Sequence, residues 1–130
     1  MTGLYVDSSA ILKRIFIAPE SPRVRAILRD RVAAGALVAS SELAWVEVAR
    51  AILRAGVRGT EPVEAAFSGI AQLPLSSTAL TRARAVGAPN LRSLDAIHLA
   101  AAIELGAVEM LTFDRRLADA AGMVGVKVIG

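Results

Sequence analysis

Short apolar runs alternate along this chain with longer stretches in which apolar residues recur at helical spacing. A short run bounded by Gly, Asp or Ser is typical of a buried strand, and a period near 3.6 residues is typical of a helix packed on one face. This alternation predicts an α/β fold with a central parallel sheet, because parallel strands need crossover helices and are buried on both faces. We expect strands at 4–6, 36–39, 72–75, 109–113 and 126–129, and helices at 8–17, 22–35, 42–55, 61–70, 78–86, 93–105 and 115–121.

The length and the absence of certain features bound the kind of protein. A chain of 130 residues without repeats or a low-complexity linker is expected to form one domain, residues 1–130. No stretch approaches the roughly 20 apolar residues of a membrane span, and the first residues do not resemble a signal peptide. There is no Cys, so disulfides and thiolate metal sites are excluded. We expect a cytoplasmic protein that does not enter a membrane.

The charge and the apolar content suggest partners. The chain has 15 Lys and Arg residues against 12 Asp and Glu residues, a net charge of +3, and all but two of the basic residues are Arg. Arg binds phosphate through a planar fork of donors, which suits a nucleic-acid partner, although coding bias is an alternative explanation. Because 55% of the residues are apolar and only 4% are aromatic, the core is expected to consist of aliphatic side chains. We expect some of the apolar excess to be covered in a homodimer or by another partner protein.

Four acidic residues lie in apolar surroundings and are the candidate site: Asp7, Glu47, Asp95 and Asp114. Asp7 and Asp114 each follow an apolar strand, and ligands of parallel sheets bind at the carboxyl ends of the strands. Carboxylates that are buried close together repel one another, and a divalent cation removes that repulsion. Oxygen ligands of this kind suit Mg²⁺, with Mn²⁺ as a second possibility.

Three of these acids also have simple structural explanations. Asp7 and Asp114 each precede an expected helix and are suitable N-caps. Asp95 lies in the first turn of its helix, where the helix dipole favours an anion.

Glu47 lies in mid-helix, where its structural alternative is a pair with Arg50 or Arg54. Glu42 is its rival as a site residue, but five residues of helix place the two side chains about 140° apart. We select Glu47, since Glu42 lies in a first helical turn, where an acid needs no function. His98, the only His, lies three residues after Asp95; we interpret it as a packed or surface residue rather than a catalytic one.

Four segments, in order, resemble those of PIN-domain endoribonucleases, and most closely the VapC toxins of bacterial toxin–antitoxin pairs. They are YVDSSA at 5–10, the stretch 40–51 with its Glu followed by Arg and Ala, LRSLDAIHLA at 91–100, and LTFDRRL at 111–117. The third is the most specific. Each segment alone is a weak signal, but together they span nearly the whole chain at suitable spacing.

The resemblance implies a three-layer α/β/α PIN-like fold in which the four acids meet at the strand ends. Asp7, Glu47, Asp95 and Asp114 would then hold one or two Mg²⁺ or Mn²⁺ ions, with the hydroxyls of Ser8 and Thr112 organising the site. It also implies RNA as the substrate and a small VapB-like antitoxin as a partner. Metal-activated water would hydrolyse the phosphodiester.

Candidate phosphate contacts on the RNA backbone are Arg50, Arg92, Arg115 and Arg116, with a solvated surface position as the alternative for each. Other functions remain open: an RNA-processing nuclease outside a toxin pair, or a non-catalytic RNA-binding or interaction module. A phosphoacceptor receiver domain is disfavoured because Lys13 and Lys127 are poorly placed. A phosphatase with an Asp nucleophile is disfavoured because Ser9 stands where its second Asp is needed.

Overall fold

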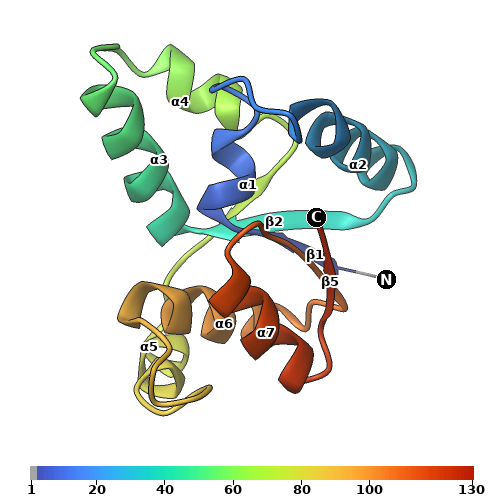
Figure 1. The fold of residues 1–130 in the computed structure, drawn as a ribbon, viewed down its shortest axis with the longest axis vertical. Helices are drawn as coiled ribbons and strands as arrows, with labels where there is room; N and C mark the ends of the chain where they lie inside the picture. Colours follow the sequence, from blue (N-terminus) through green and yellow to red (C-terminus); the bar gives the residue numbers. More distant parts are fainter. Residues whose placement is uncertain (1–2) are drawn as a thin grey trace.

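The computed structural model describes residues 3–130, which form an α/β/α sandwich around one sheet (Figure 1). All strand pairs in the sheet are parallel, and the strand order is β3-β2-β1-β4-β5. The strands are β1 (Gly3–Val6), β2 (Leu37–Ser41), β3 (Ala71–Leu73), β4 (Glu109–Leu111) and β5 (Lys127–Ile129). The parallel sheet predicted from the alternating pattern is therefore confirmed.

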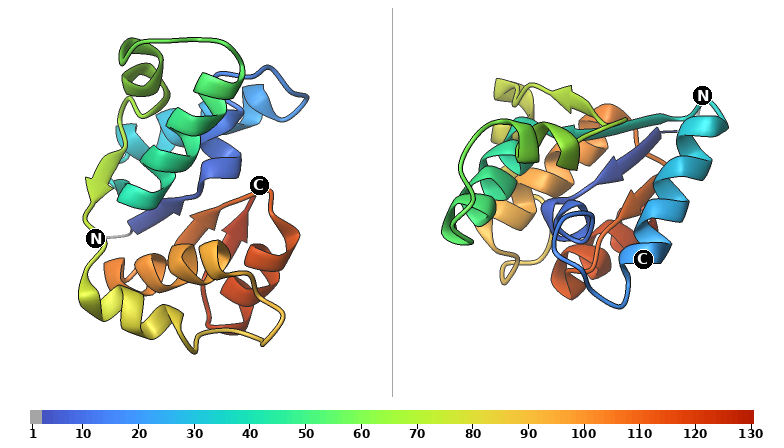
Figure 2. Two further views of the ribbon diagram at one scale, coloured as in Figure 1. Left: turned by 90° about the vertical axis from the view of Figure 1, so that its left-hand side faces the viewer. Right: turned by 90° about the horizontal axis from the view of Figure 1, so that it is seen from above.

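Helices cover both faces of the sheet, as Figure 1 and both views in Figure 2 show. One face carries α1 (Ser8–Leu12), α2 (Ser21–Ala33), α3 (Glu42–Arg54) and α4 (Glu61–Ala66). The other face carries α5 (Ser77–Ala83), α6 (Ser93–Leu105) and α7 (Arg115–Met123). Each crossover between neighbouring parallel strands runs through these helices, as parallel topology requires. Within residues 3–130, no helix is long and apolar enough to cross a membrane.

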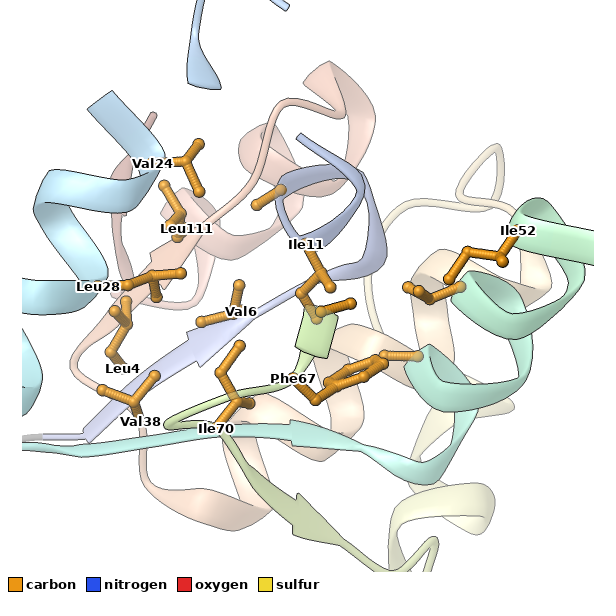
Figure 3. Close-up of a cluster of buried hydrophobic side chains, with 14 residues drawn as sticks. Leu4, Val6, Ile11, Val24, Leu28, Val38, Ile52, Phe67, Ile70 and Leu111 are labelled. Carbon is orange, nitrogen blue, oxygen red and sulfur yellow. The ribbon is translucent and has the colours of Figure 1, made fainter. Parts of the chain in front are cut away.

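The sheet separates two apolar cores, because successive side chains of a strand point to opposite faces. On the α1–α4 side, Leu4 and Val6 of β1 pack with aliphatic side chains of the helices, and Figure 3 shows this cluster. On the α5–α7 side, Tyr5 packs with Leu99 of α6 and Leu117 of α7, all fully buried. Aliphatic side chains make up most of both cores, as the composition predicted.

Some predicted boundaries were wrong. The first helix was expected to reach residue 17 but ends at Leu12. The amides of residues 13–15 donate to carbonyls three residues earlier, instead of four residues earlier as in an α-helix. Just beyond this end, the Arg14 guanidinium donates to the carbonyls of Ala66 and Ser68, at 2.7 and 2.8 Å. The fourth helix, expected to reach residue 70, ends at Ala66, and Gly69 follows with φ of 79°. The Arg14 bonds join the segment after α1 to the segment after α4, which is far away in the sequence.

Candidate active site

The site lies where the connections of the sheet change direction. β1 pairs with β2 on one side and with β4 on the other, and Val6 is level with Leu111 at the carboxyl ends of β1 and β4. The helices that follow β1 cover one face, and the helices on either side of β4 cover the other (Figure 1). Such a switch point leaves a crevice outside the strand ends, which is the usual ligand site of parallel sheets.

Asp7 is the most buried acid of the site, with 3% of its surface exposed. Its Oδ1 accepts hydrogen bonds from the Ser9 hydroxyl at 2.7 Å and the Ala10 amide at 3.1 Å, and its Oδ2 accepts from the Thr112 hydroxyl at 2.8 Å. Burial raises the pKa of Asp7, while the Ser9 hydrogen bond and nearby His98 act in the opposite direction. The carboxyl group of Asp7 is therefore held by three donors in a poorly solvated position.

The hydroxyls that hold Asp7 also join the ends of β1 and β4. The Ser9 hydroxyl accepts from the Phe113 amide at 3.0 Å, and the Thr112 hydroxyl accepts from the Asp114 amide at 3.0 Å. Thr112, predicted as a supporting residue, thus contacts two of the candidate acids. The hydroxyl bonded to Asp7 belongs to Ser9 rather than Ser8, one residue later than the resemblance implied. The residues alone gave no signal that distinguished the two neighbouring Ser side chains.

The N-cap explanation of Asp7 and Asp114 is also correct. Asp7 caps α1 through the Ala10 amide, and Asp114 caps α7 through the Leu117 amide at 3.1 Å. Capping uses lone pairs of one oxygen of each carboxylate, and a carboxylate offers about four such positions. A structural role therefore does not exclude a second role in binding.

Asp95 lies in the first turn of α6 and is partly buried. Burial raises its pKa first of all, and repulsion from Asp114 and then Asp7 adds to the increase, while His98 and Arg92 oppose it. Asp7 and Asp114, which are far from Asp95 in the sequence, thus both act electrostatically on Asp95 in the folded protein.

Glu47 occupies mid-helix in α3, and its side chain is 24% exposed. Its Oε1 lies 2.6 Å from Nε2 of His98, so its partner is neither Arg50 nor Arg54. Glu42 lies elsewhere, because its Oε1 accepts from the Leu75 amide at 2.7 Å in the loop after β3. Of the two glutamates, Glu47 is the one connected to the site.

His98 is buried and links Glu47 to the sheet. Only 2% of its surface is exposed, and its Nδ1 lies 2.7 Å from the Tyr5 hydroxyl. His98 also lowers the pKa of both Asp7 and Asp95. The sequence-based interpretation placed His98 among packed or surface residues and did not identify its contact with Glu47; its position three residues after Asp95 was the available signal.

The donor set agrees with a hard divalent cation in chemistry, but it does not form a finished metal site. The acids offer only oxygen, as Mg²⁺ prefers, and the repulsion around Asp95 is the electrostatic condition that a cation relieves. Within residues 3–130, no group of three or more Asp, Glu or His side chains is arranged so that it could hold a metal ion as it stands. The residues fit Mg²⁺ by type and charge, and its binding remains a prediction.

The four arginines predicted to contact phosphate each lie within three residues of a candidate acid in the sequence: Arg50, Arg92, Arg115 and Arg116. Arg92 precedes α6 and acts electrostatically on Asp95. Arg115 and Arg116 begin α7 directly after Asp114, and Arg50 lies almost one helical turn after Glu47. All four are exposed, which suits either contact with a phosphate backbone or a solvated position.

Comparison with known proteins identifies the family. The model of the PIN domain matches residues 4–123. The chain belongs to the PIN domain family. Ribonuclease VapC46 of Mycobacterium tuberculosis is 38% identical over 131 residues, covering 99% of this chain and 98% of its own. Ribonuclease VapC47 of the same species is 36% identical over 125 residues, covering 94% of this chain and 92% of its own.

Solved structures show the same PIN fold. A toxin–antitoxin complex from Klebsiella pneumoniae gives a TM-score of 0.70 at 22% identity, with 98% of this chain and 96% of that chain covered. M. tuberculosis VapC20, described as a toxin that cleaves the sarcin–ricin loop, gives 0.67 at 17% identity, with 95% and 98% covered. At these identities the likeness concerns the fold alone, and the relatives above carry the relation to ribonucleases VapC.

Proposed function

We propose that this PIN-domain protein is a metal-dependent endoribonuclease and the toxin of a bacterial toxin–antitoxin pair. The observation that carries the proposal is the environment of Asp95, whose pKa is raised by burial and by repulsion from Asp114 and Asp7, acids that come from distant segments of the chain. Buried carboxylates that repel one another destabilise a fold without a ligand, and a bound cation would remove that repulsion. The ribonucleases VapC at 36% and 38% identity support the same function.

Each acid of the site has a separate proposed task. Asp7 and Asp95 are the principal ligands of the ion, because Asp7 is fixed by three donors and the pKa of Asp95 is raised by repulsion from two neighbouring acids. Asp114 and Glu47 complete the ligand set directly or through water and orient the attacking water. Bound Mg²⁺, or Mn²⁺, would supply a water of lowered pKa and stabilise charge on the phosphate.

RNA binding is assigned to the exposed arginines beside the acids: Arg50, Arg92, Arg115 and Arg116. Contacts with phosphate set affinity and orientation more than sequence preference. An excess of basic charge around an acidic centre also keeps the RNA backbone near carboxylates that would otherwise repel it.

Partner proteins are proposed from the family relation and from the exposed apolar side chains. Among the larger apolar residues, Ile17 is 95% exposed, Met123 81% and Val46 59%. A VapB-like antitoxin and a second copy of the chain are the proposed partners, and the cytoplasm, where RNA is available, is the proposed location. Light scattering of the purified chain, alone and with the product of a neighbouring gene, would measure both associations.

The decisive experiment is cleavage of a defined RNA by the wild type and by variants that change one carboxylate. Asp7→Asn and Asp95→Asn should each abolish Mg²⁺-dependent cleavage, because an amide is neutral and a poor ligand of Mg²⁺. Asp119→Asn is the matched control, since Asp119 is an exposed acid on α7. Full activity in either site variant, or undiminished cleavage in excess EDTA, would overturn the metallonuclease assignment.

Growth assays separate a toxin from other RNA-binding functions. Expression of the wild type should arrest growth, Asp95→Asn should not, and co-expression of the antitoxin should restore growth. RNA cleavage without growth arrest would indicate a processing nuclease outside a toxin pair. RNA binding that leaves the RNA intact at every metal concentration would indicate a non-catalytic module.

A further inference from the structure

A line of buried polar groups connects Glu47 to the centre of the sheet. Nε2 of His98 lies 2.6 Å from Oε1 of Glu47, Nδ1 of His98 lies 2.7 Å from the Tyr5 hydroxyl, and that hydroxyl donates to the Ser41 hydroxyl at 3.0 Å. We call these residues the Tyr5–His98–Glu47 chain. Tyr5, His98 and Ser41 are all buried, with exposures of 0%, 2% and 0%.

The Tyr5–His98–Glu47 chain joins three elements that carry, or directly precede, three of the four candidate acids. Tyr5 stands two residues before Asp7 on β1, His98 stands three residues after Asp95 on α6, and Glu47 lies on α3. Helices α3 and α6 cover opposite faces of the sheet (Figure 1), so the contact between His98 and Glu47 joins the two helical layers.

The direction of the bond to Glu47 follows from the chemistry of the two groups. A carboxylate accepts hydrogen bonds and a ring N–H donates them, so we assign the proton of the contact to Nε2 of His98. At 2.6 Å the contact is at least as short as charge-assisted hydrogen bonds are. On the other side of the ring, Nδ1 lies 2.7 Å from the Tyr5 hydroxyl, whose own proton is directed to Ser41, and this contact restricts the orientation of the imidazole.

We propose that His98 is a positioning residue that fixes the side chain of Glu47 for the reaction, and that Tyr5 in turn fixes His98. The inference rests on the proposed nuclease function, because it assigns Glu47 its orientation within that site. A glutamate in mid-helix and 24% exposed has several open rotamers, and the short bond from His98 selects one of them. Outer partners of this kind tune a site through the groups they hold.

A purely packing role would not need these polar atoms. His98 lies on α6 next to Leu99, and an aliphatic side chain there would extend the apolar core without any buried polar group to satisfy. The polar line is instead continuous from Ser41 to Glu47 and ends at a carboxylate that solvent can reach. The solvent-accessible end is Glu47, a candidate site residue, so a group that positions Glu47 can influence the reaction.

The contact can be tested without any activity measurement, because His98 is the only His in the chain. In ¹⁵N-labelled protein free of metal and RNA, the imidazole should give one set of signals, with an Nε2-bound proton shifted downfield by the carboxylate. Glu47→Gln should move that proton upfield, and Tyr5→Phe should change the Nδ1 signal. A single spectrum that neither variant alters would overturn the contacts on which the inference stands.

Two substitutions of His98 separate the donor to Glu47 from the rest of the ring. The amide nitrogen of Gln takes a position similar to Nε2, whereas the amide of Asn takes a position similar to Nδ1. We expect His98→Asn to lower kcat about 10- to 100-fold with little change in KM, and His98→Gln to recover most of that loss. Val24→Ala, in the core on the far side of the sheet, is the control for stability alone and should leave kcat unchanged.

A double-substitution cycle shows whether His98 acts through Glu47. In a Glu47→Ala background, His98→Asn should cause no further loss of kcat. Mn²⁺ affinity of the RNA-free protein, measured by electron paramagnetic resonance, should fall in Glu47→Ala and His98→Asn and fall no further in the double variant. Independent, additive losses, or His98→Gln as inactive as His98→Asn in a folded protein, would overturn the inference.

Failure of this inference and failure of the proposed function give different results. If the wild type cleaves RNA with Mg²⁺ and folded His98→Asn keeps the wild-type kcat, the positioning role is wrong and the nuclease assignment stands. If the wild type cleaves no RNA while the imidazole spectrum responds to Glu47→Gln, the contact stands and the proposed function is wrong.

Discussion

Thr112→Val is the substitution that most directly tests how the strand ends are held together. The Thr112 hydroxyl is buried at 3% exposure, donates to Asp7 at 2.8 Å and accepts from the Asp114 amide at 3.0 Å. Val has nearly the same shape but no hydroxyl, so both bonds are lost and nothing else need move. One of the lost bonds is to a charged acceptor, and the other leaves a partly buried amide unpaired.

The expected size of the effect follows from these two bonds. A hydrogen bond to a charged group contributes about 1.5–3 kcal/mol and an unsatisfied buried donor costs about 1–3 kcal/mol, and the two overlap because both groups can relax. We expect Thr112→Val to lower the free energy of unfolding by about 2–4 kcal/mol. For a domain of this size each kcal/mol corresponds to about 4 °C, so the melting temperature should fall by roughly 8–16 °C.

Thr112→Ser is the matched control, since it keeps the hydroxyl and removes one buried methyl group, at a cost of about 1 kcal/mol. Urea denaturation of the metal-free protein at pH 7, followed through Trp45, measures both variants, with the slope m checked for constancy. The reasoning is refuted if Thr112→Val is as stable as Thr112→Ser or more stable. In that case the hydroxyl bridge between β1 and β4 contributes nothing beyond its packing.

Three further predictions concern charge. Burial raises the pKa of Asp7 in the folded state above its unfolded value, so the metal-free wild type should lose stability as pH rises through that folded pKa. Asp7→Asn should remove this loss. Denaturation curves measured between pH 4 and pH 8 would show the difference. The Arg31 guanidinium lowers the pKa of Glu109 through two hydrogen bonds of 2.9 and 3.0 Å. Arg31→Ala should therefore lower the free energy of unfolding by about 0.5–1 kcal/mol above the unfolded pKa of Glu109, and by progressively less as pH falls through its folded pKa. RNA cleavage should be unchanged. Mg²⁺ should raise the melting temperature of the wild type in differential scanning fluorimetry and leave that of Asp95→Asn unchanged; an equal rise in both would place the ion elsewhere.

Local sequence patterns were sufficient to predict much of the fold. The apolar run before Asp7 predicts β1 because strands buried on both faces consist mostly of apolar residues. The helix at Ser93–Leu105 was predicted with its observed ends, since Gly106 terminates it in the left-handed conformation, with φ of 72°. In contrast, the end of α1 at Leu12 was not predicted, and the Arg14 side chain just beyond it bonds to a carbonyl 52 residues away, a contact that no local pattern encodes.

The candidate acids were predicted because burying a carboxylate among apolar residues costs desolvation free energy, and apolar residues on both sides of an acid can be recognised in the sequence. Their partners were not visible. That Ser9 rather than Ser8 bonds to Asp7, and that Glu47 bonds to His98 rather than to an arginine on its own helix, depends on side-chain directions across elements. Periodicity places a residue on a face of its own helix, but only packing of that helix against the sheet determines what the face meets. The sequence by itself therefore determined the elements and the candidate acids, and the tertiary structure decided which hydroxyl, imidazole and amide groups hold them.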